Sequence, residues 1–143
     1  MLFRSGSVAP ETVLQAEMEV LRRVGFSLAK ASYIREVALA VTSGAIPTKA
    51  TMRKMSDEEI IEKLTAVKGI GRWSAEMFLI FDLGRLNVLP LGDYGVRKGF
   101  AIAYGMKTLP RPRTIMRRAK AWDPYRTLAC WYLWRVIDMK PVG

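Results

Sequence analysis

The chain has 143 residues, half of them hydrophobic and a quarter charged, which fits one folded domain with a buried core. Lys and Arg outnumber Asp and Glu by 23 to 13, and this net charge of +10 favours an anionic partner. The alternative is a soluble cationic protein that binds no anionic partner. The lack of histidine excludes imidazole catalysis, and the single cysteine excludes an internal disulfide and any four-cysteine metal cluster.

Apolar residues recur at helical spacing through the first third of the chain. A first helix is expected over residues 10–24, because a proline followed by a glutamate favours a helix start and Gly25 can end the run. Ser27 can cap a second helix, which closes at Gly44. Residues 45–55 are expected to form a connector.

The middle of the chain continues the pattern. Ser56 and Glu59 form a capping-box pattern at the start of a third helix. Residues 73–81 are apolar nearly all round, which predicts a helix buried on most faces. Asp93 can cap a further helix that runs towards Tyr104.

The C-terminal part opens with a basic stretch, RPRTIMRRAK, which leads into a last helix from near Pro124 to near Asp138. Only the short segment 86–91 alternates with the period of a strand. We therefore predict an all-α fold of about six or seven helices joined by short loops.

The sequence KGIGR, residues 68–72, lies between two predicted helices. Gly69 and Gly71 permit positive φ and let the backbone approach a ligand without a Cβ in the way. The free N–H groups and the dipole at the start of the next helix favour an anion there, and Lys68 and Arg72 add positive charge. The segment can therefore grip a DNA phosphate without reading sequence, or it can be an ordinary corner between two helices.

Residues 64–100 resemble the helix-hairpin-helix DNA glycosylase superfamily, most closely the branch of 3-methyladenine DNA glycosylase II, which excises alkylated bases. The shared features are the KGIG hairpin, an aromatic residue two positions after the second glycine, and the pattern L-P-x-G-D about twenty residues later. WDPYRTLACWYLWR, residues 122–135, resembles the closing helix of that branch, and residues 10–46 resemble the helices before the hairpin more loosely.

The resemblance covers roughly residues 8–138 and implies that residues 1–143 form a partial glycosylase domain. Its hairpin would span about residues 64–82 and its catalytic loop about residues 88–100. Further N-terminal helices of the family, with the loop that fills the gap left by a flipped base, have no match in the opening of this chain.

The resemblance implies that Asp93 is the catalytic carboxylate, which would stabilise an oxocarbenium-like sugar and orient or deprotonate water. The alternative is that Asp93 only caps a helix, with Arg97 as its ion partner, and the two roles are compatible. Relatives that also cut the strand carry a lysine where this chain has Trp73, so we expect a monofunctional enzyme that leaves an abasic site.

The resemblance also implies a pocket for an extruded base, formed by Trp73, Met77 and Trp134. For each of these residues taken alone, a core residue at helical spacing is the better explanation. Cys130 lies on the same apolar helix as Trp134, and we expect it to be a core residue rather than a reactive thiol.

DNA contacts are expected at the hairpin, from Lys68, Gly69, Gly71, Arg72 and Ser74. The family hairpin often holds a monovalent or similar cation on backbone carbonyls. These carbonyls would here belong to Thr65, Val67 and Ile70. No other cofactor is expected, and one cysteine cannot build the iron–sulfur cluster of mismatch-directed relatives.

The sequence thus predicts a monofunctional DNA glycosylase that hydrolyses the N-glycosidic bond of alkylated purines in duplex DNA during base excision repair. The alternatives are a non-catalytic helix-hairpin-helix DNA-binding module and an inactive glycosylase fragment. A further open question is whether the basic run with Arg111, Arg113, Arg117 and Arg118 extends the DNA footprint or is a solvated face.

The chain has no apolar run near the roughly 18 residues that span a bilayer and no secretory signal pattern. We therefore expect a cytoplasmic protein associated with the nucleoid. The expected partner is double-stranded DNA with damaged bases. A partner chain or a dimer is a further expectation, since either could supply the N-terminal helices that the resemblance leaves unmatched.

Overall fold

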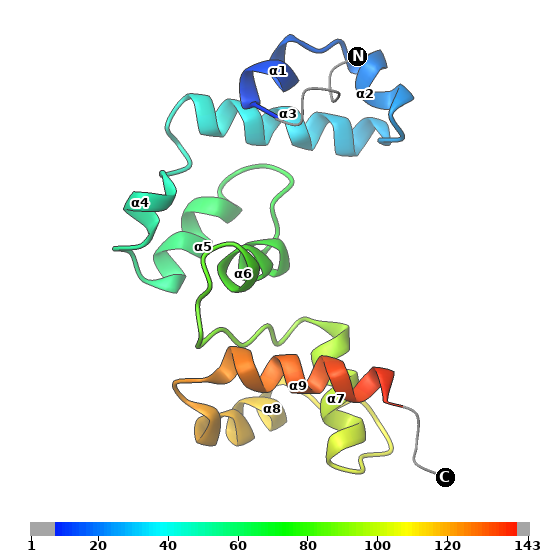
Figure 1. The fold of residues 1–143 in the computed structure, drawn as a ribbon. Coiled ribbons are helices and arrows are strands. Elements are labelled where there is room, and N and C mark those ends of the chain that lie inside the picture. The colour runs from blue at the N-terminus through cyan, green and yellow to red at the C-terminus, as the bar shows by residue number, and fades with distance from the viewer. Residues whose placement is uncertain (1–7, 140–143) are drawn as a thin grey trace. The chain divides into compact units, whose positions relative to one another are not determined.

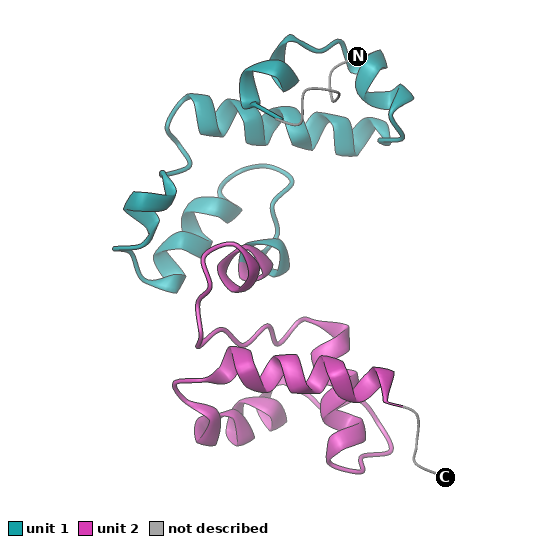
Figure 2. Cartoon of the chain, viewed as in Figure 1, with its two compact units in different colours: residues 1–75 teal, residues 76–143 magenta. Residues whose placement is uncertain are grey.

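The computed structural model describes residues 8–139 and builds them from nine α-helices, one 3₁₀ turn and no strand, which confirms the all-α prediction with more helices than expected. The chain divides into two compact units, residues 1–75 and 76–143, and the boundary falls inside one helix (Figure 2). Among residues 8–139, no helix has the length and apolar character needed to cross a membrane.

The N-terminal unit contains five complete helices (Figure 1). They are α1 (Pro10–Gln15), α2 (Met18–Arg23), α3 (Leu28–Thr42), α4 (Lys49–Met52) and α5 (Asp57–Thr65). Helices α1 and α2 lie along α3, and a small core of Ala16, Leu21 and Ala31 joins the three.

The first predicted helix is wrong in its length, because the chain breaks at Ala16 and forms α1 and α2 instead. The backbone of Ala16 is extended, with ψ 134°, and its side chain is buried against α3. The guanidinium of Arg35 on α3 donates hydrogen bonds to the carbonyls of Leu14 and Ala16, at 3.3 and 3.2 Å. These bonds satisfy carbonyls that the end of α1 leaves without helical partners.

The other start signals of this unit are confirmed. Ser27 caps α3 by accepting a hydrogen bond from the backbone N–H of Lys30, and Ser56 and Glu59 form both halves of the capping box at α5. The expected connector over 45–55 is wrong in part, because Thr48 caps the short helix α4 within it.

The C-terminal unit begins within α6 (Arg72–Phe81). It then contains α7 (Tyr94–Ala103), α8 (Pro112–Ala119), a 3₁₀ turn (Lys120–Trp122) and α9 (Arg126–Asp138). The basic stretch that was expected only to lead into the last helix is itself helical, as α8. Residues 86–91, which alternate briefly in the sequence, lie in the loop between α6 and α7 and form no strand.

Helices α7 and α9 form the main packing contact of this unit (Figure 1). Their core contains Val96, Phe100, Cys130 and Leu133, together with Ile115 of α8. Gly99 lies where α7 meets the backbone of Leu133, and a Cβ at this position would overlap the Leu133 carbonyl. The glycine therefore allows the two helices to approach closely.

The loop between α6 and α7, residues 82–93, is fastened to α9 by the buried side chain of Thr127. The Thr127 hydroxyl donates a hydrogen bond to the carbonyl of Arg85, at 2.7 Å, and accepts one from the N–H of Val88, at 2.9 Å. The backbone N–H of Thr127 also donates to the carbonyl of Leu86. This loop delivers Asp93 to the start of α7.

Candidate active site and nucleic-acid interface

Asp93 is the N-cap of α7, as the sequence predicts, and only 9% of its surface is exposed. Its Oδ1 accepts a hydrogen bond from the backbone N–H of Val96, at 2.7 Å. The proposed alternative partner, Arg97, donates from Nε to the carbonyl of Pro110, at 3.3 Å. Capping is thus confirmed for Asp93, and its catalytic role stays a prediction.

Trp134 of α9, one of the three predicted pocket residues, lies against Asp93. Its indole Nε1 donates a hydrogen bond of 2.8 Å to the same Oδ1 that accepts from Val96. Two N–H donors on one oxygen fix the orientation of the carboxylate and stabilise its negative charge. The two residues are 41 positions apart in the sequence, so only the packing of α7 on α9 brings them together.

Gly95 makes room for this contact. A Cβ at position 95 would lie 2.8 Å from Cδ1 of Trp134 and 3.0 Å from Oδ1 of Asp93. Any larger residue would therefore press between the indole and the carboxylate. Gly95 lies two residues after the L-P-x-G-D pattern, which ends at Asp93, and the sequence alone does not indicate that its role is to admit Trp134.

Phe81, at the end of α6, packs against the indole of Trp134. The two rings are stacked with centroids 5.9 Å apart and an interplanar angle of 18°. Trp131 also contacts Phe81, with centroids 6.1 Å apart, and both of these rings are more than half exposed. Asp93 therefore lies beside an aromatic group of which sequence reasoning identified only Trp134.

Cys130 is buried in the core next to this site, as expected. Burial raises the pKa of its thiol to about 12, and the negative charges of Asp93 and Glu76 add to that rise. Glu76 on α6 is itself only 5% exposed, and it is a second buried carboxylate that sequence reasoning missed. A glutamate within an apolar helical run gives no sign by itself of being buried.

The hairpin belongs to the N-terminal unit and connects α5 to α6. Gly69 has φ +98°, so the expectation of a positive φ is confirmed there, and its Cα lies against the ring of Tyr33 on α3. Gly71 has no positive φ, so the same expectation is wrong there. Its carbonyl accepts the first hydrogen bond of α6, from the N–H of Ala75. A Cβ added at Gly71 would meet no atom within 4 Å. The backbone at Gly71 is thus open to an approaching ligand.

The charged and polar residues predicted at the hairpin are exposed: Lys68, Arg72 and Ser74. Arg72 is engaged by Glu58 of α5, with its Nη2 2.6 Å from Oε1 and its Nη1 3.2 Å from Oε2. The hydrogen bond from Arg72 is the main reason that the pKa of Glu58 is lowered. Sequence reasoning missed this bidentate pair, because the two residues are 14 positions apart.

The other two predicted pocket residues lie on α6. Trp73 is 52% exposed and belongs to the N-terminal unit, whereas Met77 is half-buried and belongs to the C-terminal unit. The expected burial of residues 73–81 on most faces holds in the middle of α6, where Ala75, Leu79 and Ile80 are buried, but not at its two ends, where Trp73 and Phe81 are exposed. A pocket shared by Trp73, Met77 and Trp134 stays a prediction.

The carbonyls expected to hold a cation lie at the end of α5 and in the turn after it. Thr65 is the last residue of α5, where helical carbonyls lack partners within the helix. The carbonyl of Val67 accepts a hydrogen bond from the N–H of Ile70, at 3.1 Å, and keeps a second lone pair. Backbone carbonyls in a tight turn are suitable ligands for a monovalent cation, so the carbonyls of Thr65 and Val67 fit the expected site, and the cation itself stays a prediction.

Comparison with known proteins supports one family. Residues 2–124 match the family described as HhH-GPD superfamily base excision DNA repair protein. The chain belongs to this superfamily. The match covers both the hairpin and the segment with Asp93, which confirms the resemblance that the sequence motifs indicate.

Individual members of the HhH-GPD superfamily are similar over most of this chain. DNA-3-methyladenine glycosylase 1 of Schizosaccharomyces pombe is 40% identical over 137 residues, which cover 93% of this chain and 60% of the relative. The solved S. pombe 3-methyladenine DNA glycosylase in complex with abasic DNA has a TM-score of 0.88 and 37% identity, and covers 94% of this chain and 66% of that one.

A second solved structure, a DNA-3-methyladenine glycosidase from Bacillus halodurans, has a TM-score of 0.81 and 42% identity. It covers 90% of this chain and 59% of that one. The chain therefore spans about 60% of the length of these relatives.

Proposed function

We propose that this chain acts as a monofunctional DNA glycosylase, which hydrolyses the N-glycosidic bond of alkylated purines in duplex DNA. The observation that carries the proposal is the carboxylate of Asp93, which is nearly buried, anchored by Val96 and Trp134, and placed beside exposed aromatic rings. Membership of the HhH-GPD superfamily and similarity to proteins named 3-methyladenine DNA glycosylases support the same activity.

The chemistry needs one well-placed negative charge. As the bond from the sugar to the base nitrogen breaks, its electron pair goes to the base and positive charge develops on the sugar. Asp93 would stabilise that charge and would orient the attacking water or accept its proton. An alkylated purine is already cationic and leaves as a neutral base, so the reaction requires no dedicated general acid.

The product would be an abasic site in an uncut strand. Strand cutting in related enzymes depends on a lysine that attacks the sugar and forms a Schiff base. This chain has Trp73 at the corresponding position, and an indole cannot act as that nucleophile. Its exposed ring is instead suited to stacking on an extruded base, as are those of the aromatic group near Asp93.

The hairpin would hold the DNA backbone. The N–H groups at the start of α6, next to the unobstructed Gly71, are suited to a phosphate, and Lys68 and Ser74 are exposed close by in the sequence. A cation on the carbonyls of Thr65, Val67 and Ile70 would add positive charge to the same turn. These contacts would bind DNA without regard to sequence.

The proposal is tested by release of free 3-methyladenine from methylated duplex DNA. We expect the parent to release the base and Asp93→Asn to be slower by at least about 100-fold, the scale of a lost acid–base and electrostatic group. Asparagine is also a good N-cap, so α7 should remain folded. Asp138→Asn at the exposed end of α9 is the matched control, and it should release base at the parental rate.

Equal rates of base release by Asp93→Asn and the parent would show that Asp93 acts only as a helix cap and not in catalysis. No release by the parent, with salt-sensitive binding to DNA retained, would favour a non-catalytic binding module. A dimer or partner chain stays a prediction, which sedimentation velocity with and without duplex DNA would test. Association with the nucleoid also stays a prediction, which localisation of the tagged chain in cells would test.

A further inference from the structure

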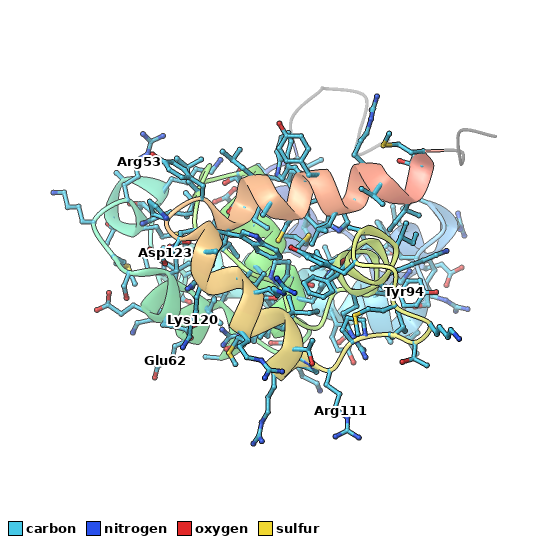
Figure 3. The ribbon with its side chains drawn as sticks, turned by 90° about the horizontal axis from the view of Figure 1, so that it is seen from below. Arg53, Glu62, Tyr94, Arg111, Lys120 and Asp123 are labelled. Atoms are coloured by element: carbon cyan, nitrogen blue, oxygen red, sulfur yellow. The ribbon has the colours of Figure 1, made fainter. Side chains whose placement is uncertain are left out.

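A pocket of about 330 Å³ lies on the exposed side of α8, within the C-terminal unit. It is lined by Leu89, Arg113, Met116, Arg117, Lys120 and Arg126. Four of these six residues are cations and none is a carboxylate. In Figure 3, Arg111 marks the N-terminal end of α8, and Lys120 and Asp123 mark the other end.

Helical spacing gathers the cations. Arg113, Arg117 and Lys120 are separated by four and three residues, so they share one face of α8 and of the turn that continues it. The opposite face is apolar, with Ile115 and Ala119 buried in the unit. Leu89 from the loop before Asp93 and Arg126 from the start of α9 complete the lining.

At the start of α8 this arrangement opposes the ordinary preferences of a helix, whereas Arg117 in the last turn is favourably placed. Like charges four residues apart destabilise a helix, and a cation in the first turn faces the positive end of the helix dipole. The first turn of α8 has no acidic residue, and Arg111 at its N-cap makes no side-chain capping bond. A bound anion would relieve both effects.

The side chains of Arg113, Arg117 and Lys120 form no ion pair within residues 8–139. Arg126 differs, because it contacts Asp123, with Nη2 3.3 Å from Oδ2, and donates from Nε to the carbonyl of Ala119. This fixed guanidinium forms one wall, and the other three cations of the pocket, two on α8 and one on the 3₁₀ turn after it, keep their charge available to a ligand.

We propose that this pocket binds a phosphate of the backbone of duplex DNA, as a second contact besides the hairpin. Residues 94–122 contain eight Lys and Arg and no Asp or Glu, so positive charge continues over α7, α8 and the segment between them. Such an extended distribution matches a ligand with repeated negative charges better than a single small anion.

The chemistry of the lining also suits a phosphodiester. Arginine presents a planar fork that binds phosphate oxygens in pairs, and Leu89 and Met116 offer apolar surface to a sugar. The choice of duplex DNA over other polyanions rests on the proposed function. The pocket itself rests only on the C-terminal unit.

The test is the salt dependence of binding to a short, undamaged DNA duplex, measured with the full chain. Each phosphate contact adds about 0.9 to the slope of log K against log salt concentration, so loss of the one proposed phosphate contact in the double variant Arg113→Gln with Arg117→Gln should reduce that slope by about 0.9. Arg113→Lys with Arg117→Lys keeps both charges and should keep the parental slope. This second variant separates loss of charge from a failure to fold, which far-ultraviolet circular dichroism also detects.

The matched control removes two exposed arginines from α2, by Arg22→Gln with Arg23→Gln, which in the parent lie near Glu19. It should change the slope far less. An equal change in the two glutamine variants would overturn the proposal, because the effect would then be one of net charge. Binding to polyglutamate, a polyanion without phosphate, is measured with the same variants. If Arg113→Gln with Arg117→Gln loses polyglutamate binding but keeps the parental salt slope for DNA, the proposal is also overturned, in favour of an acidic protein partner.

The outcomes separate the pocket from the glycosylase. Base release by the parent, with no selective slope change in the α8 variant, would leave the enzyme intact and reject the pocket. A selective slope change in a chain that releases no base would support the pocket and reject the glycosylase.

Discussion

Gly95 lies two residues after the proposed catalytic carboxylate, and its lack of a side chain decides the geometry there. Gly95→Ala would place a Cβ 2.8 Å from Cδ1 of Trp134, so the indole must move away from Asp93. Crowding of this kind costs about 1–3 kcal/mol, against a gain of up to about 1 kcal/mol for alanine over glycine in a helix. We therefore expect a net loss of about 1 kcal/mol in unfolding free energy, with slower base release.

The measurement is urea unfolding together with near-ultraviolet circular dichroism, which responds to the environment of Trp134. Gly92→Ala is the matched control, because a Cβ at that position meets no atom within 4 Å. Its unfolding free energy should stay within about 0.5 kcal/mol of the parent. If Gly95→Ala has the same unfolding free energy and the same near-ultraviolet circular dichroism as Gly92→Ala, the close contact between Trp134 and Asp93 is not maintained in solution.

At the scale of single residues, the sequence predicts what is local and misses what depends on packing. Asp93 as a cap follows from the residues around it, and the structure confirms it. The resemblance assigns Asp93 and Trp134 to one site, but nothing in the sequence predicts the hydrogen bond between them. The partners Phe81 and Glu76 have no local signature, since aromatic and acidic residues on a helix occur for many reasons.

A single hydroxyl group, that of Thr127, makes two of the hydrogen bonds that fasten the loop between α6 and α7 to α9. Thr127→Val keeps the shape of the side chain but removes the acceptor for the buried N–H of Val88 and the donor to the carbonyl of Arg85. Such a loss costs about 1–3 kcal/mol. We expect unfolding at lower urea concentration and reduced base release, because this loop positions Asp93.

Thr127→Ser keeps the hydroxyl and loses one buried methyl group, which is a loss of about 0.8 kcal/mol. It serves as the control in the same unfolding experiment. If Thr127→Val is as stable as Thr127→Ser or more so, the hydroxyl does not fasten the loop to α9.

At the scale of helices, the same division between local and distant causes holds. The capping box at Ser56 and the cap at Ser27 are encoded within a few residues, and both helices begin where predicted. The break between α1 and α2 was missed because its cause is Arg35, which is 19 residues beyond Ala16. Helix α8 was missed because its run of arginines conceals the two apolar residues that face the core, Ile115 and Ala119.

For the molecule as a whole, positive charge is balanced differently in different places. Residues 94–122 carry no carboxylate, whereas the hairpin has Glu58 paired with Arg72. This pair is exposed and so stabilises the fold by at most about 1 kcal/mol. It also competes with a phosphate for Arg72. When DNA binds at the hairpin, Arg72 can either keep its ion pair with Glu58 or exchange Glu58 for a phosphate.

Glu58→Gln should favour that exchange. With the carboxylate removed, Arg72 can contact a phosphate, so we expect tighter binding to duplex DNA and a salt slope steeper by up to about 0.9. Glu62→Gln removes the same charge from an exposed position on α5 and is the control for net charge. Equal gains in affinity for the two variants would mean that Arg72 does not reach DNA.

Acidification of the free protein tests the pair independently. The pKa of Glu58 is lowered from 4.5, chiefly by the hydrogen bond from Arg72. A carboxylate with a lowered pKa in the folded state contributes stability above its unfolded pKa, and loses it as the pH falls through the folded value. The parent should thus be more stable than Glu58→Gln at neutral pH, by at most about 1 kcal/mol, and urea unfolding should show this difference vanish below pH 4.5. A difference that persists in acid would have to come from packing of the Glu58 side chain rather than from its charge.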